Sequence, residues 1–274
     1  MGTLYLVATP IGNLEDASAR CLRILRSSVC IAAEDTRQTA KLLSHFGVRT
    51  PMIAYHEHNK IVRIDAVLER LAAGDVALVS DAGTPGVNDP GYELVRAALA
   101  AGFPVSPVPG PCAPLAALAA SGLPTDSFVY LGYLPRRSAQ RKSMLGGLAR
   151  ERRTLVALET PHRLMDSLED IQAVLGNRRI AVARELTKIH EEFVRGTVRD
   201  AVAHFGTHPP LGEITLVLEG AEESEPWTEA QVRTALKKDS RRDVPAAKLA
   251  EEIAALSGWT KRDVYTLIHT GEDK

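Results

Sequence analysis

The sequence contains few cysteines and no excess of charge of either sign. Its three cysteines, Cys21, Cys30 and Cys112, show no C-x-x-C spacing. An odd number of scattered cysteines argues against a disulfide framework and against a zinc site built from thiolates, so we expect reduced thiols and a cytoplasmic protein. The formal net charge is −1. The chain as a whole therefore does not attract nucleic acid, and any RNA contact needs a local basic patch.

Long apolar runs and the common nucleotide fingerprints are also missing. The longest apolar stretch, residues 113–120, contains Pro114 and is far shorter than the roughly 20 residues that span a bilayer. Residues 4–8 are too few for the core of a signal peptide. We therefore expect no membrane partner. Neither G-x-G-x-x-G nor G-x-x-x-x-G-K-[ST] occurs, which excludes a standard dinucleotide site and a P-loop NTPase.

The first half of the chain alternates short β-branched runs with amphipathic stretches. The predicted strands are residues 4–8, 29–33, 52–55, 76–79 and 105–108. The predicted helices are residues 17–26, 36–46, 61–73 and 92–101. This alternation predicts a mostly parallel sheet with helices packed on its faces. A cluster of prolines around residues 107–114 ends this pattern, so we place a first α/β domain at residues 1–121.

The second half is mixed and richer in strands. The predicted strands are residues 128–131, 154–158, 179–183, 192–195 and 214–218, and the predicted helices are residues 164–175 and 198–205. They define a second α/β domain at residues 122–221. After an acidic linker, residues 222–226, three short helices are predicted at residues 228–236, 246–256 and 261–268. This helix-turn-helix-like module of residues 226–274 has balanced charge, so it suits packing or dimerisation as well as nucleic-acid binding.

The most informative segment is residues 80–91, SDAGTPGVNDPG, between a buried strand and a helix. Ligands in open α/β sheets bind just outside the carboxyl ends of strands. Three glycines and two prolines specify a fixed loop that a ligand can approach closely. Asp81 and Asp89 add acceptors for hydroxyls or amines. The segment therefore predicts a ligand site rather than a plain turn.

Three more loops follow predicted strands. Residues 9–14, TPIGNL, are small enough to admit a ligand close to the backbone. Residues 108–113, VPGPCA, contain Cys112, which we interpret as structural because no base lies near it in sequence. Residues 33–37, AEDTR, place acids at a helix N-terminus, where the helix dipole favours them. The dipole explains Glu34 and Asp35 but not Arg37.

Two further features allow more than one interpretation. His56 and His58 share one face of an extended segment, but there is no evident third ligand and no H-E-x-x-H spacing, so we predict no metal site. Basic residues crowd one stretch with Glu151 as the only acid inside it: Arg136, Arg137, Arg141, Lys142, Arg150, Arg152 and Arg153. Such a stretch is either a solvated helical face or a contact for a phosphate backbone.

These segments, with residues 183–188 (ARELTK) and 212–215 (GEIT), resemble the bacterial 16S ribosomal RNA cytidine 2′-O-methyltransferases of the tetrapyrrole methylase superfamily. The resemblance runs essentially end to end, with Lys60 as a small departure. It implies two α/β domains with S-adenosylmethionine in the cleft between them, plus the helical module. It also implies a homodimer that acts on a decoding-centre cytidine of 16S rRNA in the 30S subunit. A tetrapyrrole C-methyltransferase and a non-catalytic RNA-binding protein are the alternatives.

The resemblance also implies site residues. The cofactor would contact Pro10, Ser80, Asp81, Ala82, Gly83, Val87, Cys112, Ala113, Leu158, Glu159, Glu213 and Thr215. For the in-line transfer we expect Glu34, Asp35 or His56 to accept the hydroxyl proton and Arg37 to hold a phosphate. The expected RNA contacts are Arg136, Arg137, Arg141 and Lys142.

Overall fold

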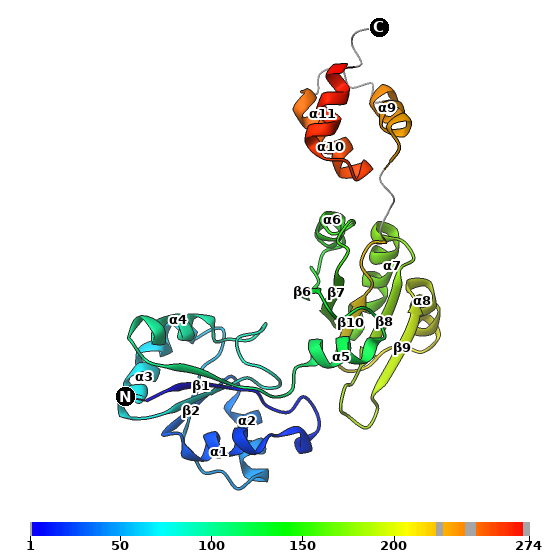
Figure 1. Cartoon of the computed structure of the whole chain (residues 1–274). Coiled ribbons are helices and arrows are strands. Elements are labelled where there is room, and N and C mark those ends of the chain that lie inside the picture. The colour runs from blue at the N-terminus through cyan, green and yellow to red at the C-terminus, as the bar shows by residue number, and fades with distance from the viewer. Residues whose placement is uncertain (1, 223–226, 239–244, 271–274) are drawn as a thin grey trace. The chain divides into compact units, whose positions relative to one another are not determined.

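The computed structural model describes residues 2–222, 227–238 and 245–270. The chain forms two compact units, residues 1–221 and residues 222–274 (Figure 1). Most of the linker predicted at residues 222–226 lies outside the described residues. Each unit is described by itself.

The first unit begins with a parallel sheet of five short strands: β1 (Leu4–Val7), β2 (Cys30–Ala33), β3 (Met52–Ala54), β4 (Val76–Val79) and β5 (Val105–Val108). Their order is β3-β2-β4-β1-β5. All five strands were predicted from the sequence. Because β1 pairs with both β4 and β5, the loops that follow these three strands emerge side by side at one edge of the sheet.

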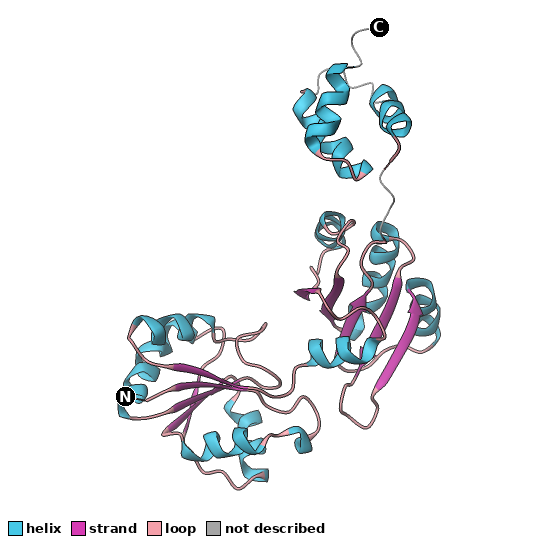
Figure 2. Cartoon of the chain, in the orientation of Figure 1, coloured by secondary structure: helices cyan, strands magenta, loops and turns pink. Residues whose placement is uncertain are grey.

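Helices cover both faces of this sheet (Figure 2). They are α1 (Ala19–Ser27), α2 (Thr36–His45), α3 (Lys60–Ala73) and α4 (Tyr92–Ala100). Alternate residues of a strand point to opposite faces, so Ile31 and Ala33 join the core under α1 and α2. Cys30 and Ala32 join the core under α3 and α4. This two-sided burial explains why β2 and β4 are apolar without alternation.

A second, mixed sheet follows: β6 (Phe128–Tyr133), β7 (Thr154–Glu159), β8 (Arg179–Arg184), β9 (Glu192–Thr197) and β10 (Ile214–Leu218). The order is β6-β7-β10-β8-β9, in which only β6 and β7 pair in parallel. One face packs against α6 (Ser138–Gly147), α7 (Leu164–Leu175) and α8 (Val198–Thr207). The other face packs against α5 (Ala113–Ser121), through Ala117 and Leu118.

Helices α5 and α6 were not among the helices predicted from the sequence, and α5 shows why such a helix is missed. Pro114 lies in its first turn, where a missing N–H costs nothing because that N–H has no helical partner. Gly122 ends the helix in the left-handed conformation, with φ +79°. A proline that seemed to interrupt the apolar run therefore begins a helix instead.

The second unit contains α9 (Glu229–Lys238), α10 (Ala246–Ser257) and α11 (Lys261–Thr270), the three helices predicted for this region. Val232, Ile253 and Val264 are buried in its core. The Trp259 indole N–H donates to the Trp227 carbonyl at 2.6 Å, which links the segment before α9 to the loop between α10 and α11. Across the described residues, no helix combines the length and the apolar character needed to cross a bilayer.

Candidate active site

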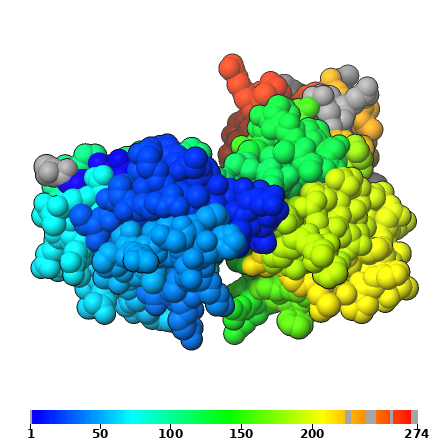
Figure 3. All heavy atoms as spheres, turned by 90° about the horizontal axis from the view of Figure 1, so that it is seen from below, coloured from blue at the N-terminus to red at the C-terminus, as the bar shows by residue number. Residues whose placement is uncertain are grey.

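A pocket of about 230 Å³ lies in the first unit, where loops of the first sheet face strands of the second. Loops after β1, β2, β4 and β5 form one wall, and β6, β7 and the start of β10 form the other. Lys188 packs against Gly12, so a β-carbon on that glycine would lie 2.4 Å from Lys188 Cγ. The space-filling view shows this dark-blue N-terminal segment against the yellow-green region of the second sheet (Figure 3).

Most residues proposed for cofactor binding line this pocket. These are Asp81, Ala82, Gly83, Val87, Cys112, Ala113, Leu158, Glu159, Glu213 and Thr215. Pro10 and Ser80 do not belong to the lining. Both are buried, and the Ser80 hydroxyl is directed to the carbonyl of Ala82 at 3.3 Å, so Ser80 shapes the loop from within.

The pocket loops are fixed to one another by backbone hydrogen bonds. The Thr9 N–H donates to the Gly83 carbonyl at 2.9 Å, and the Gly83 N–H donates to the Thr9 carbonyl at 3.0 Å. The Thr84 hydroxyl donates to the carbonyl of Pro111 at 3.3 Å. Gly83 has a φ of +79°, which a side chain would strain. The loops after β1, β4 and β5 thus form one prearranged surface.

The acidic residues of the loop after β2 form a second set of hydrogen bonds, the brace between the β2 and β4 loops. The Asp81 N–H donates to Glu34 Oε2 at 3.2 Å, and the Asp35 N–H donates to Asp81 Oδ1 at 3.0 Å. Asp35 also accepts the Arg37 N–H at 2.8 Å as the N-cap of α2 and pairs with the Arg37 guanidinium at 2.8 Å. Hydrogen bonds from Arg37 lower the pKa of Asp35 to about 2. Asp35 is therefore a cap and an ion-pair partner outside the pocket lining.

Of the three expected proton acceptors, Glu34 alone lines the pocket. Burial raises its pKa, and the hydrogen bond from the Asp81 N–H partly opposes this. His56 lies outside the lining: its N–H donates to Asn59 Oδ1 at 2.8 Å, and the Asn59 amide nitrogen lies 3.1 Å from His56 Nε2. Asn59 thus holds the His56 ring in its own loop. No group of three potential metal ligands occurs among the described residues.

Sequence reasoning missed the two tyrosines of the pocket, Tyr130 and Tyr133. In a regular strand, residues three apart point to opposite faces. The pairing of β6 with β7 shifts register between these tyrosines, and Gly132 adopts a φ of +64°. The irregularity turns both side chains toward the pocket. The available signal was Gly132, directly after the strand predicted at residues 128–131, because a glycine beside a strand can mark a bulge.

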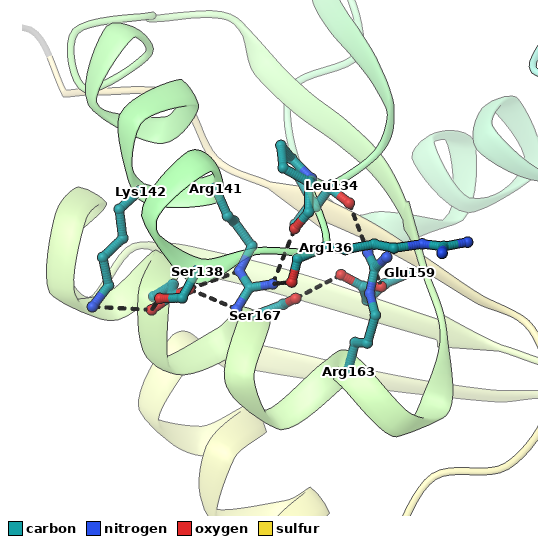
Figure 4. A network of polar contacts seen from close by, with 10 residues as sticks. Leu134, Arg136, Ser138, Arg141, Lys142, Glu159, Arg163 and Ser167 are labelled. Carbon is teal, nitrogen blue, oxygen red and sulfur yellow. Dashed lines mark hydrogen bonds and ion pairs between the residues drawn. The ribbon is translucent and has the colours of Figure 1, made fainter.

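Glu159 lines the pocket, but its carboxylate already binds residues of the segment that follows β7 (Figure 4). It accepts hydrogen bonds from the Ser167 hydroxyl at 2.6 Å and the Thr160 N–H at 2.8 Å, and it pairs with Arg163 at 2.6 Å. Arg163 also donates to the Leu134 carbonyl at 2.7 Å. Glu159 therefore holds the end of β6 in place, just after Tyr133.

The structure corrects the expected RNA contacts at Arg141. Its side chain is 2% exposed and donates to Asp170 Oδ2 through Nε at 2.7 Å and through Nη2 at 2.6 Å (Figure 4). A phosphate cannot reach a guanidinium that is already buried and paired. Lys142 also pairs with Asp170, at 3.2 Å, but its side chain is 49% exposed. Arg136 and Arg137 are exposed.

Comparisons with known proteins agree with this architecture. Residues 3–202 match the model of the family Tetrapyrrole (Corrin/Porphyrin) Methylases. The ribosomal RNA small subunit methyltransferase I of Synechocystis is 46% identical, over 97% of each chain. That of Escherichia coli O157:H7 is 44% identical, over 96% of this chain and 93% of the relative.

Among solved structures, the uroporphyrin-III C-methyltransferase of Thermus thermophilus complexed with S-adenyl homocysteine aligns with a TM-score of 0.54. It covers 79% of this chain and 97% of that chain at 21% identity, so the likeness concerns the fold. The expected fold class and the expected family are both confirmed. The chain belongs to the tetrapyrrole methylase family and, within it, to the ribosomal RNA small subunit methyltransferase I family.

Proposed function

We propose that this protein transfers a methyl group from S-adenosylmethionine to the ribose 2′-oxygen of a decoding-centre cytidine in 16S rRNA. The observation that carries the proposal is the likeness to ribosomal RNA small subunit methyltransferases I over 97% of the chain, together with a prearranged pocket. The cytoplasm is then the site of action, the assembled 30S subunit is the substrate, and the working form is a homodimer.

The pocket suits the cofactor by its chemistry. S-adenosylmethionine supplies an electrophilic methyl group on a positively charged sulfur. The loops after β2 and β4 contribute Glu34 and Asp81 to the lining, and these acidic side chains favour a cation. Val87 and Leu158 offer apolar contacts, and the glycine of the β4 loop permits close approach to the backbone.

The protein's contribution is positioning and proton transfer. Loops fixed by backbone hydrogen bonds would position the cofactor and the ribose, and positioning supplies much of the acceleration of a displacement reaction. The hydroxyl must lose its proton, so an acceptor within the pocket raises the rate. No step requires a metal.

The exposed arginines at the start of α6 are proposed to contact the RNA backbone. Arg136 and Arg137 follow Tyr133, a pocket residue, by three and four positions, so they lie beside the pocket's second wall. The main-chain carbonyl of Arg136 accepts a hydrogen bond from Arg141 at 3.5 Å, but neither the Arg136 nor the Arg137 guanidinium forms an ion pair with another described residue. Exposed arginines beside the pocket can bind the phosphates of an RNA whose nucleotide enters it.

The double charge reversal R136E/R137E is expected to weaken RNA binding and to make it less dependent on salt, because about two phosphate contacts are lost. The slope of log K against log salt should fall by roughly 1–2. Filter binding over a salt series measures this. The matched control is R23E/R199E, which changes the net charge equally in α1 and α8, neither of which lines the pocket. Equal affinity and slope in both variants and the wild type would assign Arg136 and Arg137 to a plain solvated surface.

The function is tested with labelled S-adenosylmethionine and three acceptors side by side: unmodified 30S subunits, free 16S RNA and a tetrapyrrole precursor. Label on 30S that maps to a 2′-O-methyl cytidine is the expected result. Label on free RNA alone would retain the reaction but remove the assembled subunit as substrate. Label on the tetrapyrrole alone, or on no acceptor while the cofactor binds, contradicts the proposal.

A further inference from the structure

Five carboxylate side chains line the pocket, and four of them already have a structural partner. Glu159 is held by Ser167, Thr160 and Arg163. Glu213 pairs with Lys188 at 3.3 Å, and its side chain is 73% exposed. Glu34 and Asp81 each accept a backbone N–H of the brace between the β2 and β4 loops. The fifth is Asp89.

Asp89 differs because no cation and no backbone N–H in the described part of the chain is bound to its carboxylate. The hydroxyl of Ser80, which is directed to the Ala82 carbonyl at 3.3 Å, also acts on Asp89 and lowers its pKa. A carboxylate that keeps its lone pairs free inside a partly buried pocket can accept a proton from a bound molecule.

The position of Asp89 is fixed by the contact between the β4 loop and β6. Its neighbour Asn88 has a φ of +64°, and a β-carbon on Gly132 would lie 2.7 Å from Asn88 Nδ2. Asp89 lines the same pocket as Tyr130 and Tyr133 of β6. Glu34 and Asp81, from loops of the first sheet, line this pocket as well.

We propose that Asp89 is the residue that takes the proton of the ribose 2′-hydroxyl during methyl transfer, an inference that rests on the proposed function. The O–H bond breaks and its proton passes to the Asp89 carboxylate. The oxygen's electron pair forms the new O–CH₃ bond, while the electrons of the breaking S–CH₃ bond stay on sulfur as a neutral thioether. Asp89 then releases the proton to water.

The surroundings of Asp89 tune it for this role. Burial raises its pKa to about 6, with Glu34 and Asp81 adding to the effect and Ser80 opposing it. Asp89 is thus ionised near neutral pH and yet more basic than an ordinary carboxylate. Burial also raises the pKa of Tyr130 to about 12, so this phenol stays protonated at neutral pH and does not act as the acceptor. Asp35, with a pKa of about 2, is a far weaker base.

The test compares D89N with the wild type on 30S subunits, using the full chain. D89N is expected to lower kcat by about 100- to 10,000-fold while the Kd for S-adenosylmethionine changes less than about twofold. The pH profile of wild-type kcat should fall below about pH 6, and this acid limb should vanish in D89N. D89E should restore part of the rate. D166N, which alters an exposed carboxylate of α7 outside the pocket, should behave as the wild type.

A second readout does not depend on activity. The folded pKa of Asp89 lies above the unfolded value near 3.9, so the folded state binds this proton more tightly. Wild-type stability should therefore fall as pH rises from about 4 to about 6, and the loss persists above that range. D89N removes this loss of stability, because asparagine carries no charge at any pH. The variant should therefore melt a few degrees higher than the wild type at pH 8, but not at pH 4.

Three outcomes overturn the inference. D89N with wild-type kcat shows that Asp89 accepts no proton. D89N with weakened cofactor binding and unchanged kcat makes Asp89 a cofactor ligand instead. An acid limb that persists in D89N assigns that limb to another group. If the wild type methylates no RNA, the proposed function fails and this inference falls with it, whereas the first three outcomes leave the function standing.

Discussion

Replacing Gly83 by valine is expected to weaken S-adenosylmethionine binding by about 100-fold or more, equivalent to roughly 2.7 kcal/mol or more. A β-carbon at residue 83 would lie 3.5 Å from Ile11 Cγ2 and 3.8 Å from the Pro111 carbonyl oxygen, which are ordinary contacts. The γ-carbons of valine extend further, into a pocket that Ile11 and Gly83 both line. Calorimetric titration with the cofactor measures the loss.

Backbone strain must be separated from the filling of the pocket. Gly83 has a φ of +79°, so a β-branched residue also strains the loop by about 1–3 kcal/mol. G176V is the matched control, because Gly176 has a φ of +80° and open space around its β-carbon position after α7. Both variants should lose stability, but only G83V should lose binding. G83A should show a smaller loss of binding. If G83V binds the cofactor as tightly as G176V, the pocket is not the cofactor site.

Replacing Asp170 by alanine should lower the free energy of unfolding by about 3–5 kcal/mol. The change leaves the Arg141 guanidinium, 2% exposed, with the carbonyls of Pro135 and Arg136 at 3.1 and 3.5 Å but without a counter-charge. A buried, unpaired charge is among the most destabilising defects that a single substitution can create. Urea unfolding of the full chain measures the difference. E169A, at an exposed position of the same helix, should stay within about 0.5 kcal/mol of the wild type.

The two partners of this pair are not equivalent. In R141M, Asp170 keeps the Ser138 hydroxyl at 3.0 Å and the half-exposed Lys142 at 3.2 Å, so a smaller loss of about 1–3 kcal/mol is expected. The double variant R141M/D170A should lose less than the sum of the single variants, because the two residues act as one unit. A D170A variant that stays within about 1 kcal/mol of the wild type would show that water compensates Arg141.

Lowering the pH should reduce the loss of unfolding free energy that D170A causes. Burial alone would raise the pKa of Asp170, but hydrogen bonds from Ser138, Lys142 and Arg141 outweigh it and lower the pKa. The carboxylate therefore contributes its stability above the unfolded pKa near 3.9, and this contribution is lost as pH falls through the lower folded value. The difference in unfolding free energy between the wild type and D170A should therefore become smaller as the pH is lowered.

The features that the sequence determined by itself are those that depend on neighbouring residues in the chain. All ten strands were predicted, because short apolar and β-branched runs separated by segments that contain glycine and proline are typical of strands. The apolar run of residues 76–79, which forms β4, also indicated a buried strand. The loop of residues 80–91 predicted a ligand site, because its glycines and prolines restrict the backbone locally. The family resemblance added the residues of the second wall.

Tertiary structure decided what depends on distant neighbours. Sequence assigned Arg141 to the surface with the other basic residues, but Asp170, 29 positions away, buries and neutralises it. Tyr130 and Tyr133 reach the pocket through an irregular pairing of β6 with β7. The alternation of apolar and polar residues along the sequence does not reveal this shift in register. Asp89 acquired its raised pKa from burial and from Glu34 on another strand's loop. Charge, burial and side-chain direction at these residues are set by partners that only folding brings together, whereas strands and loop geometry are set by the residues that form them.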